Sequence, residues 1–579
     1  MGNPAFDVAI IGGGPGGSTT GSLLKKYNPA LRVAILEREV FPREHIGESQ
    51  LPPIGRILHE MGAWDKVEGA GFPIKLGATY TWGKTTEPWV FGFVPFSEVR
   101  DDPRPAPYGG WRARATMQVD RAIYDDVLLK HAASLGCVVR EGTRVASVEH
   151  DTDAVTALVL EGGERVTARY YVDASGNAAV LRRDLGVTID APTLLRNVAF
   201  WSYWERPELN APIWEGEATR IQIRSLPYGW VWYIALSKHR TSVGIVCPAE
   251  YYRTCGKRPE QLYHDSLALE KQVSGWIAGG AMEGGIRSTT DWSFIAERAL
   301  GPNWFLCGEA LGFADPILSA GMTLTHTCAQ HLAYTILELD RGQLDPAWLR
   351  EQYSEVQRRR VVQHMRFAEY WYAGNGFFTA VRENCAAIAK ESGLPMTPGA
   401  AFRWLSNGGV DDIVGQAAIG GVDMAGVKQL QWRFSEPEEA VGFMVSGKNR
   451  FALNLKDARE ASVQHLQDGR IMPVRALRRG PNQLPLIGGY GMVVEALRMP
   501  QTAAGLTGAL VRLVTQHYPG PARQQAYNLA IQCLEVMASN GWVECSTVPG
   551  EPTLDVEAPR EGLLIYTESS GPPGAPARR

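Results

Sequence analysis

The sequence lacks the features that mark several large classes of protein. Its eight cysteines form no Cys-x-x-Cys pair, which argues against a structural zinc site and against the disulfide framework of a small secreted protein. No stretch reaches the roughly 18 uncharged apolar residues that a membrane span needs, and the first residues show no basic and apolar leader. We therefore expect a cytoplasmic protein that binds no membrane.

An excess of basic residues is also missing. Lysine and arginine number 58 against 62 aspartates and glutamates, a formal net charge of −4, so nothing favours nucleic acid as a partner. The 579 residues are 45% hydrophobic and 21% charged, which excludes a mainly disordered chain and allows several domains. The 17 tryptophans favour an aromatic-lined cavity, with ordinary core packing as the alternative.

A glycine-rich motif follows the first apolar run. Residues 6–11 read as a buried parallel strand, and a helix begins soon after the glycines. Gly12, Gly14 and Gly17 allow a tight turn and the close approach of a pyrophosphate to the helix N-terminus. Glu37, after the next predicted strand, stands where an acid accepts ribose hydroxyls. The pattern predicts a dinucleotide site; a purely structural glycine turn is the alternative.

Later segments extend this unit to an α/β fold. A second strand and turn at 304–310, followed by a helix at 322–339, indicate that the chain returns to its first sheet. Strand-like runs at 196–247 predict a separate, β-rich sheet. The Gly- and Pro-containing stretch 391–398 is the best linker, and the Pro/Gly/Ala-rich end, 569–579, is expected to be disordered.

Five motifs, in order, resemble those of the FAD-dependent halogenases, a family within the flavin monooxygenases that fold like aromatic hydroxylases. The resemblance covers about residues 5–390 and, more weakly, the C-terminal region. The motifs are Gly-Gly-Gly-Pro-Gly-Gly-Ser at 12–18, Phe-Pro-Arg-x-x-x-Gly-Glu-Ser at 41–49, Lys75 ahead of Trp82-Gly83, Trp-Val-Trp-Tyr-Ile at 230–234, and Gly-Glu-Ala at 308–310 with Asp-Pro-x-x-Ser-x-Gly at 315–321.

The resemblance implies a Rossmann-like FAD-binding domain with an inserted β-rich substrate domain, both within residues 1–390. The FAD-binding parts are expected at about 1–80, 110–190 and 285–345, the substrate-side sheet at about 80–110 and 190–285, and a helical segment at 345–390. Residues 400–568 are expected to form a mainly helical C-terminal domain that resembles a winged helix. Its long helix carries few basic residues for DNA, so a lid or a partner-docking module is the preferred interpretation.

The resemblance also implies how FAD is held. Glu37 and Arg38 contact the adenosine end, and Arg43 and Arg121 help to grip the cofactor; a surface helix position is the alternative for Arg121. Glu309 stands where the family usually has an aspartate against the ribityl chain. The implied cofactor-binding residues are Gly12, Gly14, Gly17, Glu37, Arg38, Arg43, Arg121, Gly308, Glu309 and Met322.

One lysine and a pair of tryptophans carry the catalytic expectation. The resemblance implies that Lys75 lies between flavin and substrate and handles the halogenating species, either as an ammonium that donates a hydrogen bond to hypohalous acid or as an amine that forms a haloamine. It implies that Trp230, Trp232 and Ile234 separate flavin from substrate. An exposed lysine and core-filling tryptophans are the alternatives.

A short turn is the expected halide site. Ser319, Ala320 and Gly321 stand where the family turns backbone N–H groups toward a halide; an ordinary turn is the alternative. Leu318 replaces the phenylalanine of phenol-type halogenases and the glutamate of tryptophan halogenases. No carboxylate is then evident to assist Lys75, which favours phenols, pyrroles and similar self-activated rings over free tryptophan.

The implied function is halogenation in natural-product biosynthesis. FADH₂ from a separate flavin reductase reacts with O₂ to give a C4a-hydroperoxide, and chloride or bromide then yields hypohalous acid for a small aromatic substrate, free or on a carrier protein. A monooxygenase or oxidase acting directly on the substrate is the alternative, since Ala235, Leu318 and Glu309 depart from halogenase habit. A catalytically degenerate FAD scaffold that docks a partner is the third.

Overall fold

The computed structural model describes residues 4–83, 87–205, 214, 216–290, 293–378, 443–480, 482–520, 522–556 and 565–567. The chain divides into two compact units, Met1–Ser392 with Leu563–Arg579 and Gly393–Gly562. The predicted linker 391–398 and the tail 569–579 lie outside the described residues. Within those residues, no helix combines the length and apolarity that crossing a membrane requires.

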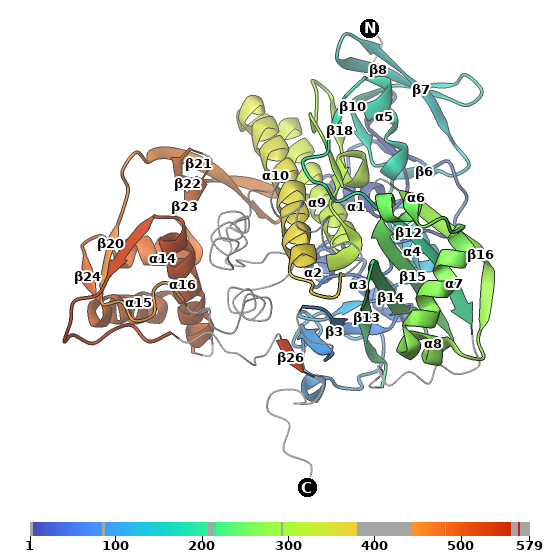
Figure 1. The fold of residues 1–579 in the computed structure, drawn as a ribbon. Coiled ribbons are helices and arrows are strands. Elements are labelled where there is room, and N and C mark those ends of the chain that lie inside the picture. The colour runs from blue at the N-terminus through green and yellow to red at the C-terminus, as the bar shows by residue number, and fades with distance from the viewer. Residues whose placement is uncertain are drawn as a thin grey trace. The chain divides into compact units, whose positions relative to one another are not determined.

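A five-stranded parallel sheet forms the base of the first unit, in the order β18-β10-β1-β2-β6. The helices α1, α4 and α9 belong to the same unit of the chain (Figure 1). The chain returns to this sheet at residues 304–306, as the sequence predicts. The elements are β1 Phe6–Ile11, β2 Val33–Leu36, β6 Val138–Arg140, β10 Ala168–Asp173, β18 Trp304–Leu306, α1 Pro15–Tyr27, α4 Arg121–Ser134 and α9 Gly321–Arg341.

A larger mixed sheet stands beside it, in the order β16-β12-β15-β14-β13-β3-β4-β26, with β5 paired to β3. Its strands are β3 Ile74–Thr81, β4 Trp89–Gly92, β5 Thr116–Met117, β12 Asn197–Glu205, β13 Ala218–Leu226, β14 Gly229–Ala235, β15 Arg240–Pro248, β16 Ala281–Thr290 and β26 Ile565–Thr567. The predicted extent of the C-terminal domain, 400–568, is wrong at its end, because β26 pairs with β4 of the first unit. A three-residue strand carries no sequence signal for the sheet it joins.

Shorter elements complete the first unit. Two small sheets have the orders β7-β8-β9 and β11-β17-β19. The strands are β7 Val145–Asp151, β8 Ala154–Leu160, β9 Arg165–Val166, β11 Ile189–Asp190, β17 Phe294–Ala296 and β19 Gly312–Phe313. The helices are α2 Pro53–Met61, α3 Trp64–Gly69, α5 Val180–Asp184, α6 Ala249–Thr254, α7 Pro259–Leu269 and α8 Lys271–Ile277, with 3₁₀ turns at Phe96–Glu98, Gly176–Ala178, Gly308–Ala310 and Pro316–Leu318.

The helix α10, Pro346–Ala373, runs beside α9 (Figure 1). Asp345 caps its start by accepting a hydrogen bond from the Ala347 N–H, and Pro346 suits the first helical position. Its last turn reaches the mixed sheet, where the Trp82 indole donates to the Trp371 carbonyl at 2.8 Å. The predicted helical segment 345–390 therefore begins as expected; α10 ends at Ala373, ahead of the turn at 374–378, and residues 379–390 lie outside the described residues.

The second unit mixes helices with strands. Its described elements are β20 Arg450–Leu453, β21 Arg459–Gln467, β22 Arg470–Arg479, β23 Asn482–Pro485, α14 Gly488–Ala496, β24 Gln501–Thr502, α15 Ala503–His517, α16 Ala522–Ser539 and β25 Val543–Ser546. The sheet orders are β24-β20-β25 and β21-β22-β23. The described part of the predicted helical domain also holds these two sheets, and residues 400–442 of that domain lie outside the described residues. The strands β21 and β22 are half exposed and charged, so they show no strong apolar alternation.

The packing of Trp232 against Gly244 yields a stability prediction. The two residues are directly paired across β14 and β15, and a Cβ at Gly244 would lie 2.2 Å from the indole Cζ2. We expect Gly244→Ala to lower the free energy of unfolding by about 1–3 kcal/mol, as overpacking does. Gly285→Ala is the control, because a Cβ there meets nothing within 4 Å. Equal denaturant midpoints for the two variants would contradict this packing.

Candidate active site

One cavity of about 810 Å³ opens at the carboxyl ends of β1 and β10, where open α/β sheets bind their ligands. Three of the predicted site residues, Gly17, Ala320 and Lys75, are not among its lining. The predicted residues that line it are Gly12, Gly14, Glu37, Arg38, Arg43, Arg121, Trp230, Trp232, Ile234, Gly308, Glu309, Ser319, Gly321 and Met322.

The glycine motif turns the chain from β1 into α1. Gly12 has a φ of +100°, and a Cβ at Gly17 would lie 1.9 Å from the Gly12 carbonyl oxygen, so both positions require glycine. Helix α1 has no acidic residue in its own first turn, so no side chain of the helix itself neutralises its positive end. The Glu37 carboxylate accepts a hydrogen bond from the Gly13 N–H at 2.7 Å and fixes the loop. Gly17 thus shapes the turn from behind the cavity wall.

A loop over the cavity, residues 38–49, is anchored by a buried ion pair. Arg121 donates to both carboxylate oxygens of Asp125, at 2.8 and 2.9 Å, and to the Ile46 carbonyl at 2.8 Å; Arg43 adds a contact to Asp125 at 3.1 Å. Burial alone would raise the pKa of Asp125, but the two arginines hold it below its usual value. Arg121 is therefore a buried loop anchor at the cavity and not a surface residue.

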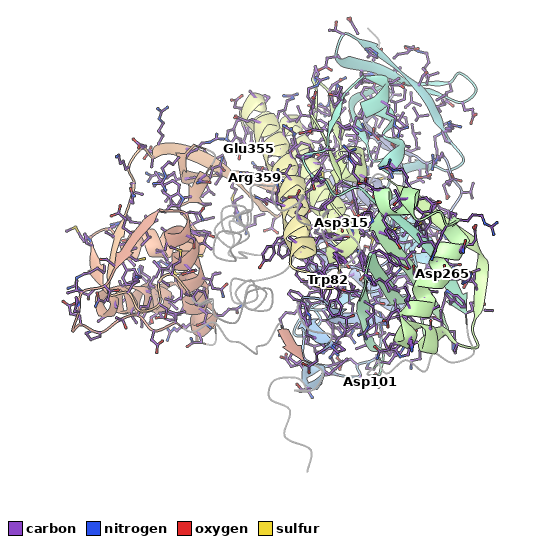
Figure 2. All side chains as sticks on the ribbon, in the orientation of Figure 1. Trp82, Asp101, Asp265, Asp315, Glu355 and Arg359 are labelled. Atoms are coloured by element: carbon purple, nitrogen blue, oxygen red, sulfur yellow. The ribbon has the colours of Figure 1, made fainter. Side chains whose placement is uncertain are left out.

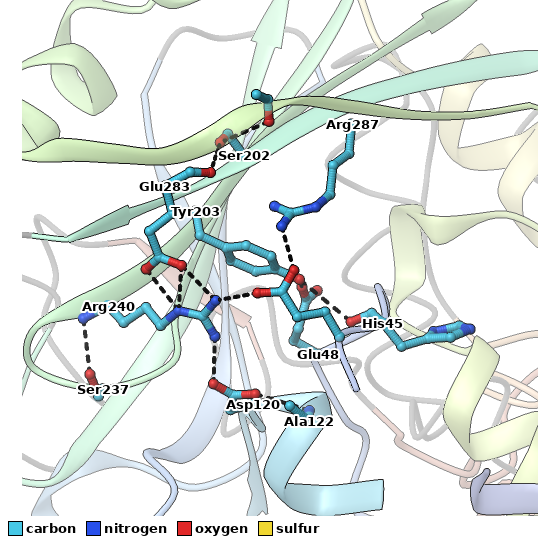
Figure 3. Close-up of polar contacts among 12 residues, drawn as sticks. His45, Glu48, Asp120, Ala122, Ser202, Tyr203, Ser237, Arg240, Glu283 and Arg287 are labelled. Carbon is cyan, nitrogen blue, oxygen red and sulfur yellow. Dashed lines mark hydrogen bonds and ion pairs between the residues drawn. The ribbon is translucent and has the colours of Figure 1, made fainter. Parts of the chain in front are cut away.

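A second set of contacts ties the same loop to the mixed sheet (Figure 3). Glu48 accepts a hydrogen bond from the Tyr203 hydroxyl at 3.0 Å, and Glu44 is paired with Arg240 and Arg287. Both guanidinium groups lie over the Tyr203 ring, 4.2 and 4.9 Å from its centroid. Sequence reasoning missed Tyr203, Arg240 and Arg287, because they lie on three strands more than 150 residues beyond the loop.

Glu309 is a half-buried carboxyl at the cavity wall. Desolvation raises its pKa, while the charge of Arg121 opposes that shift. It follows Gly308, whose φ of +62° bends the chain after β18. A partly desolvated acid near a cationic group can either accept or donate a hydrogen bond, which suits the hydroxyl groups of a sugar-alcohol chain.

The two predicted wall tryptophans lie on one face of β14 and both line the cavity. Their ring centroids are 6.0 Å apart with a tilt of 53°. The Trp232 indole donates to the Ser242 hydroxyl at 3.1 Å, and the Trp230 indole donates to the Tyr372 hydroxyl at 2.8 Å. Hydrogen bonds thus fix both rings, as buried indole N–H groups usually require, and both rings also line the cavity.

The turn before α9 carries the predicted halide residues. Ser319 has a φ of +56°, a strained conformation for a residue other than glycine, and Gly321 packs so closely on Phe313 that a Cβ would lie 2.8 Å from its ring. Ser319 and Gly321 face the cavity, whereas Ala320 is buried. The long helix α9 begins here, so its first N–H groups present a positive end to a small anion.

Lys75 is buried, with 1% of its surface exposed. Its ammonium donates to the Gln50 carbonyl at 2.7 Å and lies 5.6 Å from the centroid of the Phe93 ring. Burial lowers the pKa of Lys75 to about 7. An exposed lysine, the alternative that the sequence leaves open, does not fit the structure.

A bulge in β3 sets the direction of this side chain. Lys75 pairs with Thr219, but two residues along β13 the partner of Ile221 is Ala78, so β3 holds one extra residue. Lys75 therefore shares a face of the sheet with Tyr80, which is paired through Ile223 to Trp232. The amine lies on the same face as the tryptophan wall, yet outside the cavity that the wall lines.

The residues of the cavity fit FAD. The glycine turn leaves a cradle that any Cβ would fill, the N-terminal end of α1 suits a pyrophosphate, and the volume is in the range of cofactor sites. Within the described residues, no group of three or more His, Cys, Asp or Glu side chains suits a metal ion.

Comparisons with known proteins agree with this fit. The FAD binding domain family matches residues 5–368. The chain is 32% identical to a tryptophan 2-halogenase of Chondromyces crocatus, over 64% of this chain and 68% of that protein. It is 29% identical to the 1H-pyrrole-2-carbonyl peptidyl-carrier-protein chlorinase of Pseudomonas fluorescens, over 66% of this chain and 86% of that protein.

Solved structures share the fold. The flavin-dependent halogenase CmlS covers 96% of this chain and 98% of its own, with a TM-score of 0.70 and 24% identity. The myxobacterial chondrochloren halogenase CndH covers 75% of this chain and 97% of its own, with a TM-score of 0.56 and 28% identity. The first similarity extends the shared fold over both units of the chain.

The buried amine predicts a pH-dependent stability. Lys75 keeps its proton up to about pH 10.5 in the unfolded chain but loses it near pH 7 in the folded one. Between these values the unfolded state binds more protons, so the stability of the wild type rises with pH. We expect Lys75→Met to stabilise the protein, by about 3 kcal/mol more at pH 6 than at pH 9.

Denaturant unfolding of the wild type and the variant at both pH values measures this difference. Lys130→Met is the matched control, since Lys130 is an exposed lysine paired with Asp126 and is charged at both pH values in either state. If Lys75→Met raises the free energy of unfolding by the same amount at pH 6 and at pH 9, then burial does not lower the pKa of the Lys75 amine as described.

Proposed function

Because this chain belongs to the flavin-dependent halogenases, we propose that Lys75 is the residue at which it transfers chloride or bromide to an electron-rich aromatic ring. The observation that carries the proposal is the position of this amine. It is buried on the face of the mixed sheet that bears Trp232, but it does not line the FAD cavity. A direct flavin monooxygenase, the alternative, needs its substrate beside the flavin and has no use for such an amine.

The cavity residues bind and orient the cofactor in this proposal. The turn at Gly12 and Gly14 with the start of α1 holds the pyrophosphate, and Glu37 and Arg38 hold the adenosine end. Glu309 and Met322 face the rest of the FAD molecule, and the loop 38–49 encloses the cofactor. Reduced FAD, when bound, would give two electrons to O₂, and the activated oxygen would then take two electrons from the halide, which leaves an electrophilic halogen and water.

The halide is assigned to the N–H groups around Gly321. An anion there needs no basic side chain, because the start of α9 supplies the positive end of a helix. The indoles of Trp230 and Trp232 keep the organic substrate out of this compartment while leaving the halogen species free to pass. No nicotinamide fingerprint is evident in the sequence, so a separate flavin reductase is proposed as the source of FADH₂.

Lys75 then presents the halogen to the ring. With a pKa near 7, both of its protonation states are accessible at neutral pH. The ammonium can polarise hypohalous acid through a hydrogen bond, and the amine can carry the halogen covalently as a haloamine. The desolvated site excludes the water that would otherwise consume the halogen species.

The proposed substrates are electron-rich rings, free or attached to a carrier protein. One relative is named for tryptophan and another for a pyrrole on a peptidyl-carrier protein. Leu318 supplies no carboxylate to help Lys75, which favours rings such as phenols and pyrroles that activate themselves. The ring is attacked by electrophilic substitution and returns its proton to solvent or to the Lys75 amine.

We assign the second unit to a lid or docking role for such a substrate. Three features support a winged-helix-like arrangement: the chain order α14, β24, α15, α16, β25, the three-stranded sheet, and the position of β20 between β24 and β25. In the proposed arrangement, the position that the last strand of the wing occupies in a winged helix is filled by β20, which precedes the helices in the chain. The described part of α16 carries one arginine and one glutamate, which does not suit DNA.

A product assay tests the function. Purified protein is supplied with FAD, a flavin reductase, NADH, O₂, bromide and a panel of phenols, pyrroles and indoles, both free and carrier-bound, and the products are read by mass spectrometry. We expect bromine to be added to at least one ring. Addition of oxygen without bromine would select the monooxygenase instead.

The role of Lys75 is tested by substitution. We expect Lys75→Ala to keep FAD binding and NADH-driven O₂ consumption but to lose brominated product by at least about 100-fold, the scale of a lost acid–base group. Lys130→Ala, which removes an exposed lysine, is the control and should brominate like the wild type. Continued bromination by Lys75→Ala would remove this amine from the mechanism.

A further inference from the structure

The hydroxyl of Tyr372 joins the tryptophan wall to the turn before α9. It accepts a hydrogen bond from the Trp230 indole at 2.8 Å and another from the Asn197 side-chain amide at 3.2 Å. It donates its proton to the Asp315 carboxylate at 3.2 Å. A tyrosine hydroxyl offers one donor and two acceptor positions, so these contacts use its full capacity.

Asp315 continues the connection into the turn. Its carboxylate accepts the Ile317 N–H at 2.9 Å and thereby caps the 3₁₀ turn Pro316–Leu318, which leads directly into Ser319. Its other oxygen accepts from Asn197 at 3.0 Å. Asp315 lies beside α10, the helix that carries Tyr372 (Figure 2). The wall indole, the hydroxyl and the turn thus form one hydrogen-bonded chain that starts on β14 and ends at the cavity.

Every member of this chain is buried: Trp230, Tyr372, Asp315 and Asn197 are each at most 5% exposed. Water cannot readily replace a lost partner at such a depth, so loss of the hydroxyl would leave the Trp230 indole N–H unsatisfied. It would also remove one of the two hydrogen bonds that the Asp315 Oδ1 accepts, leaving the one from the Ile317 N–H. The ring of Tyr372 is held separately, by contacts with Trp82 and Phe378. Removing the hydroxyl alone therefore changes the hydrogen bonding without emptying the core.

We propose that Tyr372 is a positioning residue, which couples the Trp230 wall to the Ser319–Gly321 turn and thereby sets the affinity of the halide site. The inference rests on the proposed function, in which that turn binds the halide. Tyr372 touches neither the cavity nor Lys75 in this account; it acts through Trp230 and Asp315. Nothing in the sequence pattern of α10 singles it out among the aromatic residues of the last turn.

Bromide affinity of the FAD-loaded protein is the test, measured without turnover. Bromide is titrated into oxidised holoprotein, and the perturbation of flavin absorbance gives a dissociation constant. We expect Tyr372→Phe to weaken bromide binding about fivefold or more while the dissociation constant for FAD stays unchanged. Wild-type bromide affinity in Tyr372→Phe would overturn the proposal.

The same proteins are then assayed for turnover. In the variant the KM for bromide should rise by a similar factor, and a larger share of the NADH consumed should appear as hydrogen peroxide. Tyr228→Phe is the matched control, because it removes another buried hydroxyl, one that bonds Ser266 at 2.9 Å, and should leave both bromide constants unchanged. A parallel weakening in Tyr228→Phe would assign the effect to general loss of stability and overturn the specific role.

A double-mutant cycle separates positioning from a merely structural effect. Asp315→Asn breaks the same chain at its next member. The double variant Tyr372→Phe with Asp315→Asn should therefore bind bromide almost as well as whichever single variant binds it less tightly. Losses that simply multiply would contradict coupling through Asp315. If Tyr372→Phe fails to fold, Trp230→Phe removes the same hydrogen bond from its other partner, and wild-type bromide affinity there would overturn the proposal.

Failure of the proposed function gives a different result. In that case the wild type itself yields no brominated product with any ring of the panel. A wild type that brominates, together with a Tyr372→Phe variant of unchanged bromide affinity, refutes only the role of Tyr372.

Discussion

The burial of one amine constrains the rest of the active site. A lysine that loses its proton near neutral pH lies where its charged form is poorly hydrated. The free-energy cost of this desolvation must be offset by packing elsewhere in the fold. Lys75 keeps a single hydrogen bond to a backbone carbonyl and an aromatic neighbour in exchange. Such a destabilising group is retained where its chemistry is needed, which in the proposed function is the transfer of an electrophilic halogen to an aromatic ring.

Two structural devices make this arrangement possible. The bulge in β3 turns Lys75 onto the face that carries the tryptophan wall, and it depends on Gly77, where a Cβ would lie 2.2 Å from the Phe91 carbonyl oxygen. The loop 38–49 encloses the cofactor cavity and is anchored from both sides, by Asp125 through two arginines and by Tyr203 through Glu48. The mixed sheet thus contributes both the tryptophan wall of the cavity, on β14, and the buried amine, on β3, which Gln50 and Phe93 hold outside that cavity.

The sequence predicted much of this fold because its signals are local. The strand, glycine turn and helix at residues 6–27 follow from spacing alone, and the return of the chain at residues 304–306 was evident from a second strand and turn. Most of the site residues that motif order identified do line the cavity. The burial of Lys75 was not predictable from Pro-Ile-Lys-Leu-Gly by itself, since it results from Gln50 and Phe93, which come from other segments. The same limit hid Tyr203, Arg240 and Tyr372, whose partners at the site, Glu48, Glu44 and Asp315, are more than 50 residues distant. It also hid the pairing of β26 with β4.

A crystal structure of the protein with FAD and bromide tests the central claim, the separation of cofactor and amine, most directly. The account predicts anomalous scattering from bromide at the backbone of Ser319–Gly321, the isoalloxazine ring on the cavity side of Trp230 and Trp232, and Lys75 buried on the other side without contact to the flavin. An isoalloxazine ring packed directly against the Lys75 amine, or an amine open to bulk solvent, would contradict it.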